Sequence, residues 1–433
     1  MNDSARKIQC IRGLVAAAMM LLSGACQSPA PQSSPSADTK APSSVSPAPP
    51  ASSVTPADAP PSASTATHAE ITPESPPATP QILTPVSFAE LPGWAQDNHA
   101  DALPALLASC RVIAKQAAWR ATCEAASTVK GREAARQFFE HHFTPHRVAN
   151  PDGTLEGLAT GYYEPTIRGS RTRSARNRYP VYAAPDDIFV IDLAAVAPEL
   201  KGSLPRGRLD GRRVVPYFTR AQIETENSPL RGREIAWVDD AIDLFFLQVQ
   251  GSGRIALAEG GVMRIGFADH NGQPYRSIGR VLIERGELPA ERASMQGIKT
   301  WARAHPARLT DLLHQNPRYV FFRELTGPAT SPPGAQGVPL TPERSVAIDP
   351  RYIPLGAPVH IATTWPNTSK PLHRLMLAQD TGGAIRGAVR IDYFWGAGDT
   401  AALEAGRMQQ PVRKWVLLPQ GYTAVNGALQ KIQ

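Results

Sequence analysis

The first 87 residues of this 433-residue chain contain no phenylalanine, tryptophan or tyrosine. Residues 27–80 also hold 14 of the 42 prolines. Such a segment cannot bury enough apolar surface to offset the entropy lost on ordering. Residues 26–83 are therefore predicted to form a disordered linker rich in Pro, Ser and Ala. Every aromatic residue lies between Phe88 and Tyr422, so the packed part of the protein is expected after the linker.

The sequence also has no run of like charges and few long apolar runs. Its 45 basic and 38 acidic residues give a formal net charge of +7, with the basic residues scattered among the acidic ones. No nucleic-acid-binding motif accompanies them, so a nucleic-acid partner is not expected. Beyond residue 26, no segment is apolar enough over a sufficient length to cross a membrane. The composition excludes collagen, a coiled coil and a wholly disordered chain.

The N-terminal residues are typical of an export signal. Basic residues precede the apolar segment Gly13–Leu22, which is too short for a stable membrane anchor. The sequence Ser-Gly-Ala-Cys at positions 23–26 makes residues 1–25 resemble a bacterial lipoprotein signal peptide, with Cys26 as the acylated first residue. Gln27 after the cysteine implies transport to the outer membrane, so we expect a lipid-anchored protein on its periplasmic face. Plain secretion without a role for Cys26 is the alternative.

Cysteine is scarce, with four residues in the whole chain. Cys10 lies in the signal and Cys26 is assigned to the lipid, so Cys110 and Cys123 remain. An even number of cysteines outside the cytoplasm indicates one disulfide. Two buried free thiols are the alternative.

Hydrophobic periodicity divides the packed part into a helical beginning and a strand-rich remainder. Apolar residues recur every three or four positions between residues 88 and 148, which predicts helices ending at Pro145. From Leu155 onward, short apolar segments between Gly, Pro and Asp indicate strands, including residues 242–250. Helical spacing returns in residues 278–283 and 294–315. The predicted fold class is mainly β with some helices, and a barrel is the economical way to close such short strands.

Two motifs raise other functions that the sequence does not support. His141, His142 and His146 have no carboxylate or cysteine at a known ligand spacing, so we expect surface or capping histidines and neither a metal nor another cofactor. The sequence Gly251-Ser252-Gly253 lacks the lysine of a phosphate-binding loop and does not match a Gly-x-Ser-x-Gly nucleophile elbow.

Three aspartates in the last quarter are candidates for chemistry. Asp349 precedes a proline, and a turn-forming role is preferred for it; for Asp380, before Thr-Gly-Gly, a turn and a site are equally weighted. Asp392 lies in an apolar, aromatic strand, where desolvating a carboxylate is costly. Its pKa could rise until it donates a proton near neutrality, whereas Arg390 on the same strand face would lower that pKa. The sequence leaves both alternatives open.

Six short motifs follow one another along the chain, and none is specific alone. They are Thr160-Gly161-Tyr162-Tyr163-Glu164-Pro165, Val249–Gly253, Tyr275–Gly279, Ser294–Gly297, Gln315–Pro317 and the C-terminal module with the three aspartates. In this order they resemble the membrane-bound lytic murein transglycosylase A family. The resemblance covers the chain from about Leu83 to Pro419.

The resemblance implies a fold and a site. Residues 84–167 and 326–429 would form a double-psi β-barrel domain, with residues 168–325 inserted as a second β-barrel domain and a sugar groove where the two meet. Asp392 would be the catalytic acid/base, with Asp380 beside it in the cleft. The remaining motif residues that would face the groove are taken as saccharide contacts: Thr160, Tyr162, Gln250 and Ser252.

The implied activity is that of a peptidoglycan lytic exotransglycosylase, which cleaves the β-1,4 bond between N-acetylmuramic acid and N-acetylglucosamine. Ordinary glycosidases use two carboxylates. Here one aspartate would suffice, because the C6 hydroxyl of the muramoyl ring attacks and closes a 1,6-anhydro ring. The implied partners are peptidoglycan glycan strands, the outer membrane through the lipid anchor, and cell-wall synthesis proteins. Two alternatives remain: a non-catalytic peptidoglycan-binding outer-membrane lipoprotein, and hydrolysis of an unrelated β-glucan.

Overall fold

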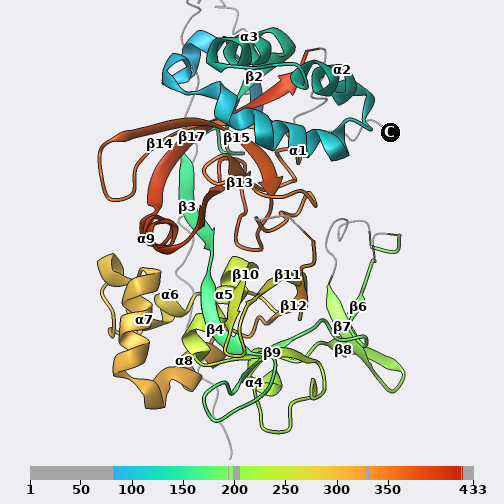
Figure 1. Cartoon of the computed structure of the whole chain (residues 1–433), viewed down its shortest axis with the longest axis vertical. Helices are drawn as coiled ribbons and strands as arrows, with labels where there is room; N and C mark the ends of the chain where they lie inside the picture. The colour runs from blue at the N-terminus through green and yellow to red at the C-terminus, as the bar shows by residue number, and fades with distance from the viewer. Residues whose placement is uncertain (1–80, 194, 198–204, 328–330, 421, 423–433) are drawn as a thin grey trace, which may run out of the picture. The chain divides into compact units, whose positions relative to one another are not determined.

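The computed structural model describes residues 81–193, 195–197, 205–327, 331–420 and 422. The chain divides into two compact units, Met1–Glu74 and Ser75–Gln433, and every described residue belongs to the second. The predicted signal peptide, Cys26 and residues 26–80 of the predicted linker lie outside the described residues. The described part is mostly β with some helices, which confirms the predicted fold class (Figure 1).

The first described segment is helical, as predicted, and leads into a strand. Its elements are β1 (Leu83–Pro85), the 3-10 turns Phe88–Glu90, Trp94–Gln96 and His99–Ala102, α1 (Leu103–Ile113), α2 (Ala117–Ala126), α3 (Arg132–His142) and β2 (Phe143–Val148). A disulfide joins Cys110 of α1 to Cys123 of α2. The predicted helical end at Pro145 is wrong, because α3 ends at His142 and Pro145 lies in β2. Proline has no N–H to donate to a neighbouring strand, but β1 ends opposite His146, so no hydrogen bond of β1 is lost at Pro145. The Pro145 carbonyl still accepts from the Val86 amide, at 3.0 Å.

Eight strands form the first sheet, and the last strand in their order pairs back with the third. The order is β1-β2-β17-β14-β15-β13-β16-β3, and β17 also pairs with β3. The strands not yet bounded are β3 (Gly157–Glu164), β13 (Ser345–Ala347), β14 (Pro358–Thr364), β15 (Pro371–Asp380), β16 (Ile391–Ala397) and β17 (Gln409–Pro419). Their inward side chains, among them Val346, Ile361, Leu375 and Tyr393, are fully buried in one hydrophobic core with the N-terminal helices.

A second sheet continues directly from the first. Pro165 alone separates β3 from β4 (Thr166–Ser170), so one extended segment runs from the first sheet into the second (Figure 1). The order of the second sheet is β12-β11-β10-β4-β9-β5, and a bridge between Ala183 and Phe322 links the end of β5 to β12. Its other strands are β5 (Tyr179–Tyr182), β9 (Glu234–Val238), β10 (Ser252–Leu257), β11 (Val262–His270) and β12 (Val320–Glu324).

Smaller elements surround this second sheet. A third sheet contains β6 (Phe189–Val190), β7 (Arg206–Asp210) and β8 (Arg213–Pro216), and the helices are α4 (Arg220–Ile223), α5 (Ala241–Gln250), α6 (Ile278–Glu284), α7 (Met295–Ala304) and α8 (Leu309–His314). Helices α6, α7 and α8 confirm the helical spacing seen in the sequence. They pack with one face of α5 around residues such as Phe245, Leu282 and Trp301.

Two further elements differ from the sequence prediction. Residues 242–250 were expected to be a strand but form α5, because the helix is buried on almost every side and apolar residues therefore mask its period. Asp240 caps it by accepting from the Ile242 amide at 2.9 Å, and Gly251 ends it with a φ of 79°. Helix α9 (Asp399–Arg407) was also not predicted, because the chain after residue 322 was assigned to strands and turns.

A buried ion pair ties the N-terminal segment to the first sheet. Asp97 and Arg344 are each less than 9% exposed and form two parallel hydrogen bonds of 2.9 Å. The Leu375 amide of β15 also donates to Asp97, at 2.7 Å. Burial raises the pKa of Asp97, but Arg344 and this amide outweigh it and hold the pKa below its usual value. The ionised pair therefore stabilises the fold at neutral pH.

We expect Asp97→Asn to lower the free energy of unfolding by about 3–5 kcal/mol at pH 7, because it leaves the Arg344 charge buried without its partner. Asp101→Asn is the matched control: Asp101 also contacts Arg344, at 3.1 Å, but its side chain is 55% exposed, so its loss should cost less than about 1 kcal/mol. Denaturant unfolding checks both variants. The cost of Asp97→Asn should shrink as the pH falls through the lowered pKa of Asp97. Equal costs for both variants at pH 7 would contradict the assignment.

Candidate active site

Asp392 occupies the second position of β16, between two neighbouring strands. It is paired in register with Ala347 of β13 and with Thr160 of β3. Its neighbours Ile391 and Tyr393 are fully buried, whereas Asp392 itself is partly exposed. The strand therefore fixes the Asp392 backbone in the core, while the residue as a whole keeps some exposure.

A hydrogen-bonded chain connects Asp392 to Arg390. The Arg390 guanidinium donates through Nη2 to the Thr160 hydroxyl at 2.7 Å, and that hydroxyl donates to Oδ1 of Asp392 at 2.6 Å. Because the Thr160 oxygen already accepts from Arg390, its own hydrogen is directed at the carboxylate. Arg390 thus contacts the hydroxyl that orients Asp392.

Burial decides the protonation of Asp392. Burial raises the pKa of this carboxyl to about 6. The positive charge of Arg390 and the hydrogen bond from Thr160 both lower the pKa, but their effect is smaller. The negative charge of Asp380 adds to the increase. The two effects expected from the sequence, an increase of the pKa by desolvation and a decrease by Arg390, therefore act together, and desolvation is the larger. A carboxyl with this pKa can give up and take back a proton near neutral pH.

Asp380 ends β15 and is held by three donors. Its Oδ1 accepts from the amides of Ala335 at 2.8 Å and Thr381 at 2.9 Å, and its Oδ2 accepts from the Tyr162 hydroxyl at 2.9 Å. Burial raises the pKa of Asp380, and these hydrogen bonds oppose the increase. Both oxygens of Asp380 are engaged, whereas within the described residues Asp392 accepts a side-chain hydrogen bond only from Thr160. Asp392 is therefore the better placed of the two to exchange a proton with a ligand.

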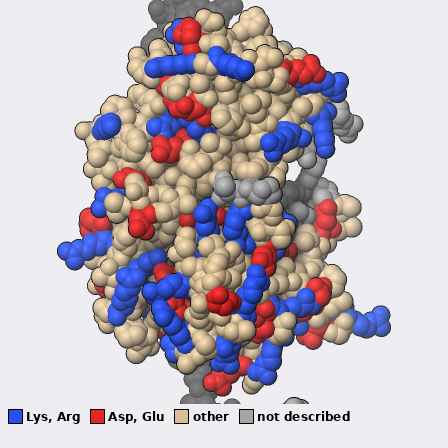
Figure 2. All heavy atoms as spheres, in the orientation of Figure 1, with Lys and Arg blue, Asp and Glu red and all other residues tan. Residues whose placement is uncertain are grey.

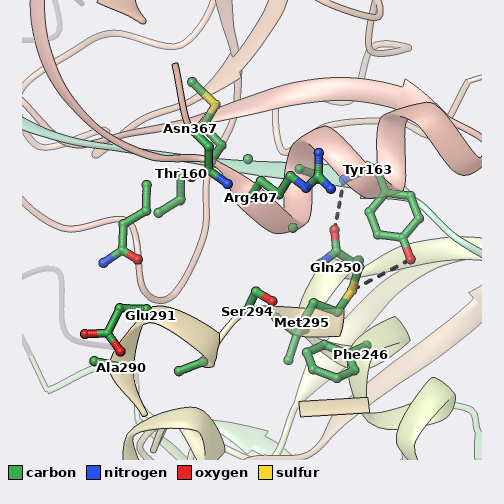
Figure 3. A pocket seen from close by; sticks show the side chains of 17 residues that line it. Thr160, Tyr163, Phe246, Gln250, Ala290, Glu291, Ser294, Met295, Asn367 and Arg407 are labelled. Carbon is green, nitrogen blue, oxygen red and sulfur yellow. Dashed lines mark hydrogen bonds between the residues drawn. The ribbon is translucent and has the colours of Figure 1, made fainter. Parts of the chain in front are cut away.

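A cavity of about 550 Å³ adjoins Thr160 (Figure 3). One wall comes from β3, the β14–β15 turn and the end of α9; the facing wall comes from α5 and the start of α7. The lining residues are Thr160, Gly161, Tyr163, Phe246, Val249, Gln250, Ala290, Glu291, Ala293, Ser294, Met295, Asn367, Ala405, Gly406, Arg407, Met408 and Gln409. Both polar and apolar side chains thus line a space large enough for part of an oligosaccharide.

Close packing explains the glycine in the Thr160-Gly161-Tyr162 motif. A Cβ on Gly161 would lie 2.6 Å from Nε1 of Trp395 and 2.9 Å from Cα of Ala405 in α9. Any larger residue would push α9 away from β3 and shift Thr160 with it. Gln250 fixes the opposite wall, because its Oε1 accepts from the Tyr163 amide at 2.9 Å and joins the end of α5 to β3 (Figure 3).

The expected saccharide contacts fall into two groups. Thr160 and Gln250 line the cavity. Tyr162 is buried and contacts Asp380 and the Phe394 ring instead, at 5.1 Å between ring centroids. Ser252 lies at the start of β10, opposite Gly266, and is not among the residues lining this cavity.

Sequence reasoning missed several lining residues. Asn367, Glu291 and residues 407–409 line the cavity and lie outside the six sequence motifs. The signal for 407–409 was the alanine-rich sequence of α9, in which Ala401 and Ala405 recur four residues apart and are buried. The Ser294–Gly297 motif does reach the cavity, because Ser294 and Met295 line it. Ser294 also caps α7 by accepting from the Gly297 amide at 3.2 Å.

Asp349 is buried away from this cavity. Its Oδ1 accepts from the Arg351 amide two residues later at 3.1 Å, and its Oδ2 accepts from the Gly387 amide at 2.9 Å. These are the contacts that its turn-forming interpretation requires. Asp349 also forms an ion pair with Arg351, and it fastens the segment that leads to Arg390 and Asp392.

Among the described residues no group of three or more His, Cys, Asp or Glu could hold a metal ion. No described helix has both the length and the apolar character needed to span a membrane.

Comparisons with known proteins identify the family. The MltA-specific insert domain matches residues 158–323, and the 3D domain matches residues 344–418. Membrane-bound lytic murein transglycosylase A of Escherichia coli (strain K12) is 35% identical over 268 residues, which is 60% of this chain and 64% of that relative. The chain thus spans about 64% of the length of this relative.

Solved structures agree with the sequence comparisons. MltA from Neisseria gonorrhoeae is 40% identical and superposes with a TM-score of 0.68 over 78% of this chain and 93% of that chain. E. coli MltA with bound chitohexaose is 28% identical, with a TM-score of 0.61 over 78% of this chain and 95% of that chain. The fold and these matches define a protein related to murein-degrading enzymes. The chain belongs to the membrane-bound lytic murein transglycosylase A (MltA) family, as the resemblance predicted.

Two variants should move the pKa of Asp392 in opposite directions. Arg390→Gln removes a positive charge and should raise it, whereas Asp380→Asn removes a negative charge and should lower it, from about 6 in the wild type. Carboxyl-¹³C NMR of aspartate-labelled protein, assigned with Asp392→Asn, measures this titration.

Arg413→Gln provides the control, since Arg413 is exposed on β17 and is not among the charges that act on Asp392. It should leave the titration unchanged. A wild-type pKa near the usual 3.8, or shifts of the same sign in both test variants, would refute this electrostatic account.

Proposed function

We propose that this protein is a lytic transglycosylase that cleaves the β-1,4 bond between N-acetylmuramic acid and N-acetylglucosamine in murein, with Asp392 as general acid and base. The observation that carries the proposal is one partly exposed carboxyl with a pKa of about 6, which accepts a hydrogen bond from Thr160, a residue that lines the cavity; Asp392 itself is not among the lining residues. Family membership supports the reaction class, because the matched relatives are named lytic murein transglycosylases.

In the first step, Asp392 in its protonated form donates to the glycosidic oxygen, and the N-acetylglucosamine side departs. Its raised pKa keeps a useful fraction protonated near neutrality. The Thr160 hydroxyl donates a hydrogen bond to Oδ1 of Asp392, so the transferred proton is carried by Oδ2. The positive charge that develops on the sugar ring is stabilised by the Asp380 carboxylate or by the substrate acetamido group.

In the second step, the same carboxylate takes the proton from the C6 hydroxyl as that oxygen attacks C1. Nucleophile and electrophile belong to one sugar, so an effective molarity of about 10⁵ M or more is available to well-aligned geometry. Intramolecular attack therefore outcompetes water, and the product is a 1,6-anhydromuramoyl end. No second catalytic carboxylate is needed, which accords with the fixed hydrogen bonds of Asp380.

The glycan is proposed to bind between the two sheets. In support, E. coli MltA has been solved with bound chitohexaose. We propose residues 84–167 and 326–429 as a double-psi β-barrel domain and 168–325 as an inserted β-barrel domain. The ring of pairings from β17 through β16 to β3 and the Ala183–Phe322 bridge are consistent with this division.

Anchoring at the periplasmic face of the outer membrane through acylated Cys26 remains part of the proposal. The relatives are named membrane-bound, and the Cys26 motif is typical of lipoproteins. The saccharide contacts proposed are Thr160 and Gln250 in the cavity and Ser252 beyond it, with Tyr162 acting through Asp380.

Digestion of purified murein sacculi tests the reaction. The wild type should release muropeptides with 1,6-anhydro ends, and Asp392→Asn should lower the rate by at least about 100-fold, because the replacement can neither donate nor accept the proton. Asp210→Asn, an exposed residue of β7, should keep the wild-type rate. Mass spectrometry identifies the products.

Three results would overturn the proposal. Anhydro products that persist in Asp392→Asn would remove Asp392 from its role. Reducing ends from the wild type would indicate hydrolysis instead. Murein binding without soluble products would establish a wall-binding lipoprotein.

A further inference from the structure

The excess positive charge of the chain is concentrated in the segment that matches the insert model. Residues 158–323 contain 24 of the 45 Lys and Arg residues but 18 of the 38 Asp and Glu residues. Figure 2 shows Lys and Arg side chains gathered over the lower part of the molecule, where Figure 1 places β4 to β12. This charge suits an anionic ligand, but the glycan backbone of murein is itself uncharged.

Arg318 lies against the loop that follows Asp380, and the charges of Arg206 and Arg386 act on it. Arg318 precedes β12, Arg206 begins β7, and Arg386 lies in the segment between β15 and β16. Arg318 is partly buried against the loop: a Cβ on Gly383 would lie 3.2 Å from its Nη2. Gly383 is three residues beyond Asp380, so the guanidinium lies close to the proposed active site.

The groups around Arg318 leave this cluster positively charged. Burial and the charges of Arg206 and Arg386 lower the pKa of Arg318, and Asp269 is the anionic residue acting against them. Arg206 donates to Asp269 through Nε at 3.1 Å, while the Arg318 guanidinium donates to the backbone carbonyl of Gln273 at 3.3 Å. His270 adds no positive charge near neutrality, because burial and these arginines lower its pKa to about 4. Asp269 is thus the one carboxylate that acts on Arg318, and within the described residues Arg318 forms no ion pair with it.

Holding like charges together costs free energy unless an anion binds among them. Guanidinium groups match the planar geometry of a carboxylate and can bind it with two parallel hydrogen bonds. Arg206, Arg318 and Arg386 are not among the residues that line the 550 Å³ cavity, so the arginine cluster is distinct from that cavity.

We propose that Arg206, Arg318 and Arg386 bind a carboxylate of the murein stem peptide while the adjacent glycan lies at Asp392. This inference rests on the proposed function and adds to it that the enzyme recognises the peptide as well as the sugar. Murein carries its carboxylates on the muramoyl side chain, either on the stem peptide or, where the peptide has been removed, on the lactyl group. The site would favour strands that still bear peptides.

Binding is measured in the Asp392→Asn background, so that strands are not consumed and the result does not depend on cleavage. The ligands are peptide-bearing glycan strands, amidase-treated strands that retain the lactyl carboxylate, and chitohexaose, which has no carboxylate. Arg386→Ala and Arg318→Ala should each weaken binding of peptide-bearing strands about tenfold or more. Both should leave chitohexaose binding unchanged. Arg318→Lys, which keeps the charge but not the planar fork, should give an intermediate loss.

The double variant Arg212→Ala/Arg213→Ala is the matched control, because it removes two exposed arginines from the neighbouring β7–β8 hairpin. It should bind all three ligands as the parent does. Arg386 is exposed, so Arg386→Ala tests the site even if Arg318→Ala is poorly folded.

Each other outcome is decisive. An equal loss for chitohexaose would show that the arginines only support the fold, and an equal loss in the control would show non-specific attraction; either overturns the proposal. A loss confined to amidase-treated strands would move recognition to the lactyl carboxylate and contradict a peptide site. Absence of cleavage by the wild type would refute the proposed function. The binding comparison would still test the arginine site, because it does not depend on cleavage.

Discussion

The account depends on the desolvation of one carboxyl group inside a strand. Asp392 is fixed between Thr160 of β3 and Ala347 of β13, in a sheet whose pairings return to β17, so its position cannot relax into solvent without breaking strand pairing. Burial raises its pKa, while Arg390 and Thr160 prevent the increase from becoming so large that the group never ionises. A group that must both donate and accept a proton needs this balance.

The two neighbouring aspartates illustrate how surroundings separate similar side chains. Both carboxylate oxygens of Asp380 accept hydrogen bonds, from the Ala335 and Thr381 amides and from the Tyr162 hydroxyl. Asp392 has one hydrogen bond, from a hydroxyl that Arg390 itself orients. Asp380 is thus suited to hold a fixed negative charge, and Asp392 to exchange a proton.

Local patterns predicted the parts of this protein in which one physical signal dominates. The spacing of α7 and α8, the strand around Asp392 and the turn at Asp349 could all be read from neighbouring residues. Helix α5 could not, since burial on nearly every side removes the amphipathic period, although Asp240 and Gly251 marked its ends. The cavity and the arginine cluster could not either, because they join residues such as Thr160 and Arg407, or Arg318 and Gly383, that only the folded chain brings together.

The most direct test of the central claim is the pH dependence of kcat on murein glycan strands. If Asp392 must be protonated to begin the reaction, kcat falls as the pH rises through about 6, the pKa of this carboxyl. Arg390→Gln should move that fall to higher pH. A kcat that is constant or increases between pH 5 and 8, on the scale where this group titrates, would contradict the claim that Asp392 supplies the proton.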